Sequence, residues 1–328
     1  MALRAVVTGA GGFIGHHLVR YLKARGYWVR GVDLHLPLYE PSPADEFLLL
    51  DLRSRENCRV ATANVDEVYA LAADMGGMGY ISSNHATILR DNSLIDIFTL
   101  DTAAENGASR LFYASSACVY PEYRQMEAAI PGLREEDAYP AAPQDAYGWE
   151  KLMAERLCQH YREEGRIETR IARFHNIFGP LGTWEGGREK APAAIARKVA
   201  IAKLTGNPEV EIWGDGEQTR SFCYIDDCLE GIFRLMHSDY GEPLNIGSDR
   251  MVTINQLLEC VAKHAGIEVR PKHIPGPQGV RGRNSDNTRV RQVLGWEPQV
   301  TLEDGMARLY DWVEEQVAAR LRQAAGIA

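Results

Sequence analysis

The sequence contains little cysteine and no cysteine motif. Its six cysteines are spread over 328 residues, with no C-x-x-C pair and no Cys/His spacing typical of a zinc site. A disulfide scaffold is therefore excluded, and no metal site is predicted. Reduced thiols are typical of the cytoplasm, so we expect a cytoplasmic protein.

Excess positive charge and long apolar runs are also missing. Lys and Arg number 36 against 45 Asp and Glu, a formal charge of −9 that would repel a phosphate backbone. No apolar run approaches the ~20 residues that span a bilayer. The N-terminus leads directly into a strand-like segment and lacks the apolar region of a signal peptide. We expect a soluble protein with neither a nucleic-acid nor a membrane partner.

The residues present are ordinary for a globular protein, at 45% hydrophobic and 25% charged. Over the first 175 residues, short β-rich runs alternate with helix-like stretches, which predicts a parallel sheet with helices on both faces. The expected strands are Ala5–Thr8, Trp28–Asp33, Phe47–Leu50, Glu67–Leu71, Arg110–Ala114 and Glu168–Arg173.

Beyond residue 178 the pattern changes, with clustered Gly and Pro and then further helical stretches. We predict the α/β class: a Rossmann-type doubly wound parallel sheet with a smaller, discontinuous substrate-binding lobe. Residues 1–178 would form the first domain, with 218–248 returning to it. Residues 179–217 and 249–328 would mainly form the lobe, and 273–286 would be a polar loop.

A glycine-rich turn joins the first expected strand to the first helix. Gly9, Gly12 and Gly15 allow a tight turn and a close approach to a pyrophosphate, and Phe13 and Ile14 lie in the same turn, before the helix whose N-terminus attracts the anion. Asp33 ends the second strand 18 residues after Gly15, where a carboxylate accepts hydrogen bonds from ribose hydroxyls. No Arg follows Asp33, which favours NAD over NADP. The alternative is a structural turn beside a surface aspartate.

Asp51 ends the third expected strand. Two interpretations stay open for this residue: it holds the edge of the adenine, or it caps the helix that follows.

Tyr147 and Lys151 are four residues apart in a helical segment, so both side chains lie on one face. A free tyrosine has a pKa of ~10 and is a poor base at neutral pH. A neighbouring ammonium and a nicotinamide cation would lower that pKa and prepare Tyr147 for proton transfer. The alternative is a solvated helix face, which the presence of the dinucleotide-binding pattern in the same chain disfavours.

Four segments, GAGGFIG, ASSACVYP, YGWEK and RFHNIFGP, resemble the extended short-chain dehydrogenase/reductase superfamily that acts on sugar nucleotides. The resemblance implies that Ser116 and Tyr147 hold the 4-hydroxyl of the sugar. It also implies that Tyr147, assisted by Lys151, takes the hydroxyl proton while hydride leaves for NAD. A homodimer formed through two helices that flank the sheet is expected from the same resemblance.

Further segments resemble the GDP-mannose 3,5-epimerase family: AADMGGMG, SSACVYPE, PQDAYG, GTWEGGREKAPAA, WGDGEQTRSF and PGPQGVRGRNSDN. The resemblance implies that Cys118 and Lys190 form an acid/base pair. A ketone at carbon 4 would acidify carbons 3 and 5, and inversion needs a base on one ring face and an acid on the other. Cys118 follows Ser116 by two, so in an extended segment both would face the same site.

The same resemblance implies further contacts with the substrate. Arginine suits bidentate phosphate binding, although any single arginine or loop glycine is more often an ordinary surface residue. Arg283 is a weaker candidate of the same kind. The expected substrate contacts, besides Ser116 and Lys190, are Gly76, Gly77, Met78, Asn176, Glu189, Lys198, Gln218, Arg220 and Arg281.

These motifs favour an NAD-dependent isomerase that inverts carbons 3 and 5 of a GDP-sugar, with GDP-mannose as the first candidate. A 4-epimerase, a 3- or 5-epimerase of a related sugar nucleotide, and a 4,6-dehydratase are the alternatives. Such a dehydratase typically carries Asp-Glu where this chain has Ala117-Cys118. A non-enzymatic NAD-binding regulator is the least favoured, because Ser116, Tyr147 and Lys151 occur together.

Overall fold

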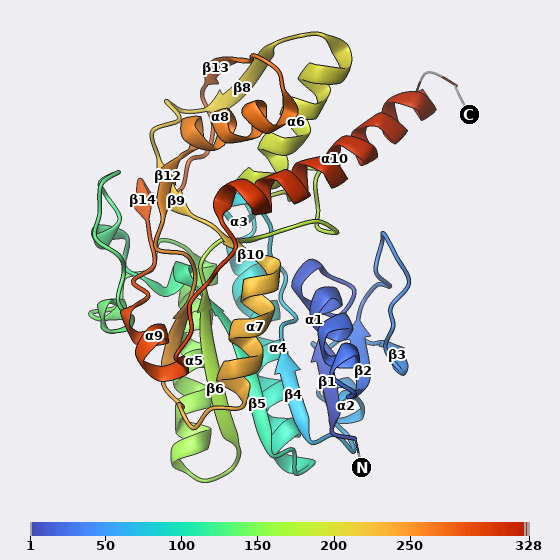
Figure 1. The fold of residues 1–328 in the computed structure, drawn as a ribbon. Helices are drawn as coiled ribbons and strands as arrows, with labels where there is room; N and C mark the ends of the chain where they lie inside the picture. Colours follow the sequence, from blue (N-terminus) through green and yellow to red (C-terminus); the bar gives the residue numbers. More distant parts are fainter. Residues whose placement is uncertain (1, 325, 327–328) are drawn as a thin grey trace.

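The main element of the fold is a seven-stranded parallel sheet in the order β11-β6-β5-β4-β1-β2-β3, seen in the lower half of Figure 1. The computed structural model describes residues 2–324 and 326. The strands of this sheet are β1 (Arg4–Thr8), β2 (Trp28–Asp33), β3 (Glu46–Leu49), β4 (Glu67–Ala70), β5 (Arg110–Ser116), β6 (Glu168–Phe174) and β11 (Pro243–Ile246).

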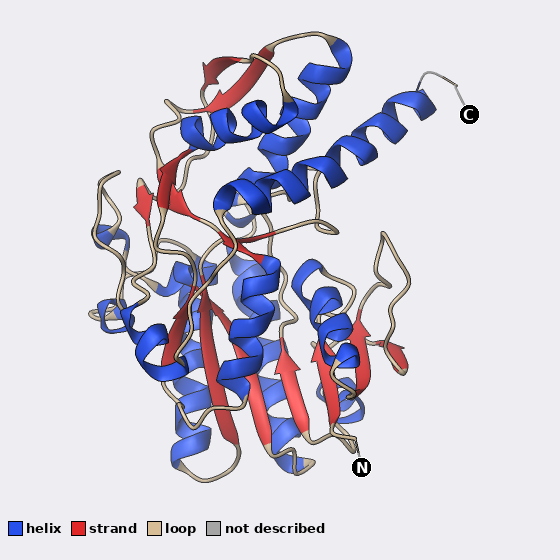
Figure 2. Cartoon of the chain, in the orientation of Figure 1, coloured by secondary structure: helices blue, strands red, loops and turns tan. Residues whose placement is uncertain are grey.

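Helices cover both faces of this sheet (Figure 2). The reason is visible in β1, where Ala5 and Val7 pack into one apolar core and Val6 packs into the other. A strand that is apolar on both sides must be covered on both sides. One face carries α1 (Phe13–Ala24) and α7 (Ile225–Met236), and the other carries α2 (Arg55–Ala61), α4 (His85–Glu105) and α5 (Ala146–Glu163). The predicted Rossmann-type fold is confirmed.

A second group of elements lies beyond the carboxyl ends of the strands, in the upper half of Figure 1. Its helices pack on one another, and its apolar residues continue one of the two cores of the sheet. The boundaries of the two parts at residues 178, 217 and 248 stay a prediction. The elements of this group are α6 (Ala191–Thr205), β8 (Glu209–Trp213), α8 (Ile254–Ala265), β13 (Arg270–Ile274) and α10 (Leu302–Ala324).

The remaining elements are short; α9 (Thr288–Leu294) lies beside β11 at the edge of the sheet, and others lie between the two groups. Two small sheets, β12-β9-β14 and β10-β7, run between them, and three 3₁₀ turns follow β5. These elements are α3 (Met78–Ile81), η1 (Ala117–Val119), η2 (Glu122–Arg124), η3 (Glu135–Ala138), β7 (Ile177–Phe178), β9 (Thr219–Ser221), β10 (Cys223–Tyr224), β12 (Met251–Thr253), β14 (Gly282–Arg283) and α9 (Thr288–Leu294).

Two expectations about the elements are wrong. β11 adds a seventh strand to the six expected, because its four residues pair in parallel with Ile171–Phe174 and owe their strand geometry to that partner. The expected loop 273–286 contains the end of β13 and all of β14, which pair with β8 and β9. The strands β11, β13 and β14 all depend on pairing with distant segments, which the local sequence does not encode.

In the described part of the chain, no helix is both long and apolar enough to cross a membrane. Among the same residues, no three His, Cys, Asp or Glu side chains are grouped so that they could hold a metal ion.

Candidate active site

The glycine turn between β1 and α1 forms a cradle shaped for a dinucleotide. Gly9 has a φ of +72°, and a Cβ on Gly15 would lie 2.0 Å from the carbonyl oxygen of Gly9. Only glycine fits either position. Gly12 is the N-cap of α1, so the free N–H groups at Phe13 and Ile14 point to where a pyrophosphate would lie.

Asp33, at the end of β2, lies beside this cradle. Its Oδ2 accepts a hydrogen bond from the N–H of Gly11 at 2.9 Å, and its Oδ1 accepts one from Leu34 at 2.6 Å. The carboxylate is thus fixed next to the turn and remains partly exposed. A fixed acceptor beside a helix N-terminus matches the ribose and pyrophosphate of a dinucleotide.

Asp51 lies in the turn before α2. Its Oδ1 accepts a hydrogen bond from the backbone N–H of Arg53 at 2.9 Å, and its Oδ2 pairs with the Arg53 guanidinium at 2.7 Å. The hydrogen bond from this guanidinium lowers the pKa of Asp51. Ser54, not Asp51, is the N-cap of α2, so the capping interpretation is wrong. The contact with adenine stays a prediction.

Tyr147 and Lys151 lie in the first turns of α5, which begins at an N-cap: the Asp145 side chain accepts from the N–H of Gly148 at 2.9 Å. Both side chains are buried, at 6% and 2% exposed. The Lys151 Nζ lies 5.7 Å from the centroid of the Tyr147 ring. The predicted i, i+4 pair therefore shares one face, and that face is turned into the protein.

The two members of this pair have shifted pKa values. Burial raises the pKa of Tyr147, and the Lys151 ammonium opposes that shift. Burial alone would lower the pKa of Lys151, but the charges of Asp96 and Glu150 outweigh it and the net shift is upward. Lys151 therefore keeps its proton, and its contribution is a fixed positive charge beside the phenol.

Ser116 ends β5 and caps η1, where its Oγ accepts from the N–H of Cys118 at 3.2 Å. The expectation that residues 116–118 are extended is wrong, because the chain turns into η1 there. Cys118 nevertheless packs against the apolar cluster formed by Tyr147, Ile81 and Ile88. A Cβ on Gly148 would lie 2.2 Å from the Cys118 carbonyl oxygen, so this glycine lets α5 approach the turn.

Arg283 of β14 contacts Cys118: its Nη1 donates to the Cys118 Sγ at 3.3 Å, while its Nε donates to Gln125 at 2.6 Å. A guanidinium only donates, so the Cys118 sulfur is the acceptor of this hydrogen bond. From the sequence motifs, Arg283 is only a weak candidate for binding phosphate. Its 165-residue separation from Cys118 left no local signal for this contact.

Lys190 is the N-cap of α6. The segment before Lys190 contacts the loop at Gly76 and Gly77, because the N–H of Gly77 donates a hydrogen bond to the Arg188 carbonyl at 3.1 Å. Lys190 retains contact with solvent, yet the protein packed around its ammonium lowers its pKa, and a negative Cys118 would raise it. Lys190 therefore lies within electrostatic range of Cys118 and is shifted toward proton exchange.

Arg220 of β9 lies beside Arg283, its parallel register partner in β14. Its Nη2 donates to the carbonyl of Val280 at 2.7 Å. Burial and the charge of Arg283 lower the pKa of Arg220 to about 9. Two adjacent guanidiniums form a local cationic surface in an acidic protein, which suits a diphosphate.

Other predicted substrate residues have partners within the protein. Arg281 pairs with Asp215 at 2.8 Å, Glu189 pairs with Arg197 at 2.7 Å, and Lys198 donates to the Glu211 carbonyl at 2.6 Å. These pairings give each of the three a role in the protein itself. Their contacts with substrate stay predictions.

The remaining predicted contacts fall on turns. Asn176 has a φ of +46° and donates from Nδ2 to the Ser221 carbonyl at 2.8 Å. Gln218 donates to the Trp213 carbonyl at 3.2 Å, and its buried Oε1 has no partner in the described structure. Met78 begins α3, and its side chain lies outside what the structure describes.

The cradle, the Tyr-x-x-x-Lys pair and the doubly wound sheet define a dinucleotide-dependent protein of the short-chain dehydrogenase/reductase class. The model of the NAD dependent epimerase/dehydratase family matches residues 5–247. The chain belongs to this family, and it is an enzyme whose cofactor is NAD.

Curated relatives extend the match. GDP-mannose 3,5-epimerase 1 of Oryza sativa subsp. indica is 51% identical over 328 residues, which cover 99% of this chain and 85% of the relative. GDP-mannose 3,5-epimerase of Arabidopsis thaliana is 51% identical over 317 residues, which cover 96% and 83%. The sequence similarity thus spans both parts of the fold.

Solved structures show the same architecture. The UDP-glucose 4-epimerase of Thermotoga maritima, with UDP-glucose, superposes with a TM-score of 0.84 at 24% identity, covering 96% of this chain and 100% of that one. MoeE5 in complex with UDP-glucuronic acid and NAD superposes with a TM-score of 0.81 at 28% identity, with coverage of 96% and 100%.

Proposed function

We propose that the chain is a GDP-mannose 3,5-epimerase. The observation that carries the proposal is that Cys118, just after β5, packs on the apolar cluster that contains Tyr147, the partner of Lys151. Lys190, at the N-cap of α6, lies within electrostatic range of Cys118. A 4-epimerase needs only Tyr147 and Lys151. The names of the relatives with 51% identity support the same reaction.

The first step is removal of a proton from the sugar. Ser116 and Tyr147 hold the 4-hydroxyl, and Tyr147 takes its proton while the Lys151 ammonium stabilises the phenolate. NAD, when bound, supplies the hydride acceptor for carbon 4 and later the hydride donor. The same Tyr147 returns the proton to the oxygen at the end, so this pair is unchanged over a cycle.

The second step is inversion at the acidified carbons. With carbon 4 a ketone, the C–H groups at carbons 5 and 3 become more acidic, because the electron pair left by the proton delocalises onto the ketone oxygen. One of Cys118 and Lys190 removes the proton from one ring face, and the other delivers a proton to the opposite face. The hydrogen bond from Arg283 to the Cys118 sulfur holds that side chain in place.

The diphosphate of the substrate would lie on the cationic surface of Arg220 and Arg283, with Asn176 and Gln218 beside it. The unpartnered Oε1 of Gln218 can only accept, so its contact with substrate would be with a hydroxyl or N–H group and not with the diphosphate. GDP-mannose as the particular substrate belongs to this proposal and rests on the named relatives.

The test is the reaction in deuterated water. GDP-mannose is incubated with the NAD-bound enzyme, and carbons 3 and 5 of the recovered and converted sugar are examined by NMR. We expect deuterium at both carbons together with inverted products. A product inverted only at carbon 4, without deuterium in the ring, contradicts the proposal and indicates a 4-epimerase.

We further propose a homodimer formed through α4 and α5. These helices pack on each other, and their outer surface carries exposed apolar side chains: Leu89 at 43%, Trp149 at 47% and Met153 at 38%. The double variant Trp149→Glu and Met153→Glu should halve the mass measured by light scattering. Leu204→Glu, at a similarly exposed position on α6, is the control and should leave the mass unchanged. A monomeric native chain contradicts the proposal.

We infer residence in the cytoplasm. All six cysteines are free thiols, and four of them are buried, which suits a reducing compartment. Fractionation of cells should recover the native chain with cytosolic marker enzymes. Recovery with an oxidising compartment would contradict the inference.

A further inference from the structure

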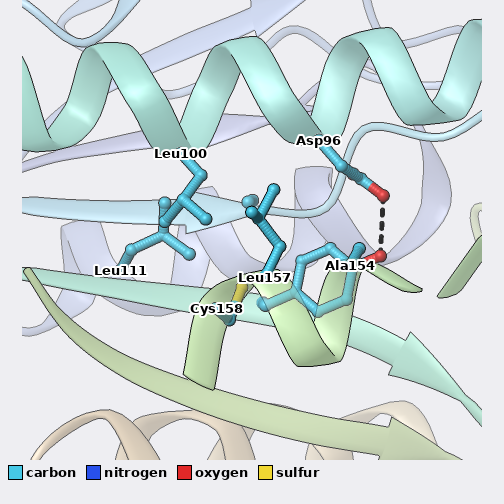
Figure 3. Close-up of a pocket in the computed structure, with 8 residues that line it drawn as sticks. Asp96, Leu100, Leu111, Ala154, Leu157 and Cys158 are labelled. Carbon is cyan, nitrogen blue, oxygen red and sulfur yellow. Dashed lines mark hydrogen bonds between the residues drawn. The ribbon is translucent and has the colours of Figure 1, made fainter. Parts of the chain in front are cut away.

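A buried charged cluster lies directly behind Lys151. The Lys151 Nζ is 3.0 Å from the hydroxyl of Tyr113 on β5 and 3.5 Å from Oδ2 of Asp96 on α4. Tyr113 in turn donates to the same Asp96 oxygen at 2.7 Å, the bond dashed in Figure 3. No member of this triangle is more than 6% exposed. The Lys151 ammonium therefore contacts the Asp96 carboxylate and the Tyr113 phenol, and the phenol also bonds to that carboxylate.

The surroundings of the triangle are apolar. Asp96 and Tyr113 border a small cavity whose other lining residues include Leu100, Leu111 and Ala154, as Figure 3 shows. Charges in such surroundings are screened little, so the carboxylate acts strongly on nearby groups. The mechanism derived above uses neither Asp96 nor Tyr113.

A second carboxylate, Glu150 of α5, also lies 3.5 Å from the Lys151 Nζ and is fully buried. Neither of its oxygens has a hydrogen-bond partner among the described residues, and burial raises its pKa to about 8. Asp96, in contrast, accepts hydrogen bonds from Tyr113 and Lys151. Burial raises the pKa of Asp96 as well, but its hydrogen bonds from Tyr113 and Lys151 favour its charged form, and Glu150 lacks such donors. Asp96 is therefore the carboxylate that the cluster is arranged to hold in its charged form.

We propose that Asp96 is a positioning residue of this enzyme, which holds the Lys151 ammonium against Tyr147 with the help of Tyr113 and sets the pH range in which Tyr147 takes the substrate's proton. The proposal rests on the oxidation step of the proposed function, not on the identity of the carbons that are inverted. Asp96 touches no substrate in this scheme.

The direction of the effect follows from the charges that face the pair. Tyr147 and Lys151 are faced by Asp96 from α4, Tyr113 from β5, Glu150 from α5 and Cys118 from η1. The negative charge of Asp96 raises the pKa of both Tyr147 and Lys151. Removing this charge lowers both pKa values. In a plot of the rate of proton abstraction against pH, the acid limb, set by Tyr147, and the alkaline limb, set by Lys151, therefore both move to lower pH.

The first test measures that movement. NAD-bound enzyme is mixed with GDP-mannose in a single turnover, and the rate of appearance of the reduced nicotinamide absorbance is followed against pH. For Asp96→Asn we expect both limbs to move down by about half to one pH unit, with KM within about twofold of native. Asp96→Glu restores the charge and should return the limbs toward native. Tyr113→Phe should cause a smaller movement in the same direction.

Two further variants control this test. Thr99→Val alters a similarly buried polar side chain one turn along α4, which contacts Cys58 of α2, and should leave both limbs in place. Glu150→Gln should leave the acid limb in place, because that carboxyl is already protonated there. The proposal is overturned if Asp96→Asn lowers the rate but leaves both limbs of the pH profile in place. It is also overturned if Glu150→Gln moves the limbs and Asp96→Asn does not.

The second test needs neither cofactor nor substrate. Thermal unfolding of the cofactor-free chain is measured for Asp96→Asn, Lys151→Met and the double variant. Asp96→Asn should lower Tm by several degrees with Lys151 present and by less than half as much with Met at 151. Equal losses in both backgrounds mean that Asp96 does not hold Lys151, and overturn the proposal. If native enzyme forms no reduced nicotinamide at all, the proposed function fails, and this cycle still decides the role of Asp96.

Discussion

Two lysines serve the candidate site, and the protein treats them in opposite ways. Lys151 is enclosed on a regular helix among carboxylates, which raise its pKa against the effect of burial. Lys190 caps a helix at the end of a loop, has no ion-pair partner within the described residues, and has a pKa lowered by the protein around it. The first lysine is built to stay charged, and the second is built to exchange a proton.

The comparison separates the site into a redox half and an inversion half. Tyr147 and Lys151 need a fixed electrostatic field, which a buried helix provides. Cys118 and Lys190 need contact with carbon-bound protons on two ring faces, and they come from different elements, η1 and the N-cap of α6. The following predictions test this division, beginning with the largest expected effect.

Tyr147→Phe removes the hydroxyl on which both halves depend, because the ring protons become acidic only after carbon 4 is oxidised. We expect a loss of about 10²–10⁴-fold in turnover of GDP-mannose and an equal loss of deuterium exchange. Both are measured by NMR in deuterated water. Exchange that persists without turnover would show that the inversion half works independently.

Lys190→Arg keeps a positive charge but cannot release a proton at accessible pH. We expect ring-proton exchange to fall by about a hundredfold or more while formation of reduced nicotinamide in a single turnover stays within about threefold of native. Retained exchange would mean that Lys190, like Lys151, acts only through its charge.

The two halves should also differ in their response to pH. The ammonium of Lys190 loses its proton at lower pH than that of Lys151, because one pKa is lowered and the other is raised. As pH rises, exchange at the carbon protonated by Lys190 should decline before oxidation at carbon 4 does. Rates of both processes measured across one pH series check the order, and simultaneous decline would contradict it.

Asp33→Ala probes the cofactor cradle, which serves both halves equally. The variant loses the acceptor expected at the ribose and the bond to the Gly11 N–H. We expect about tenfold weaker binding of NAD, by calorimetry, with little change in the rate at saturating NAD. If the variant changes only the rate at saturating NAD and leaves NAD affinity unchanged, Asp33 does not contribute to NAD binding.

The redox half could be predicted from the sequence, since its signals are local. The glycine turn, Asp33 and the four-residue spacing of Tyr147 and Lys151 each depend on a single strand–turn or helix. The parallel sheet follows from the same alternation. β11 could not be predicted, because its four residues become a strand only by pairing with β6.

The inversion half could not be derived from spacing. Cys118 and Lys190 are 72 positions apart (190 minus 118), and only the family resemblance pointed to them. Their surroundings depend on tertiary contacts. Gly148 lies close to the turn at Cys118, Gly77 donates to the segment before Lys190, and Arg283 donates to the Cys118 sulfur. The turn at Cys118 also contradicts the extended geometry that local reasoning favoured.

The division of the site is tested most directly with Cys118→Ala. The variant is mixed with NAD and GDP-mannose in deuterated water, and reduced nicotinamide and ring deuterium are measured in the same samples. The account predicts that reduced nicotinamide forms at a near-native rate while deuterium at carbons 3 and 5 falls by about a hundredfold or more. Full exchange and full turnover in this variant would contradict it.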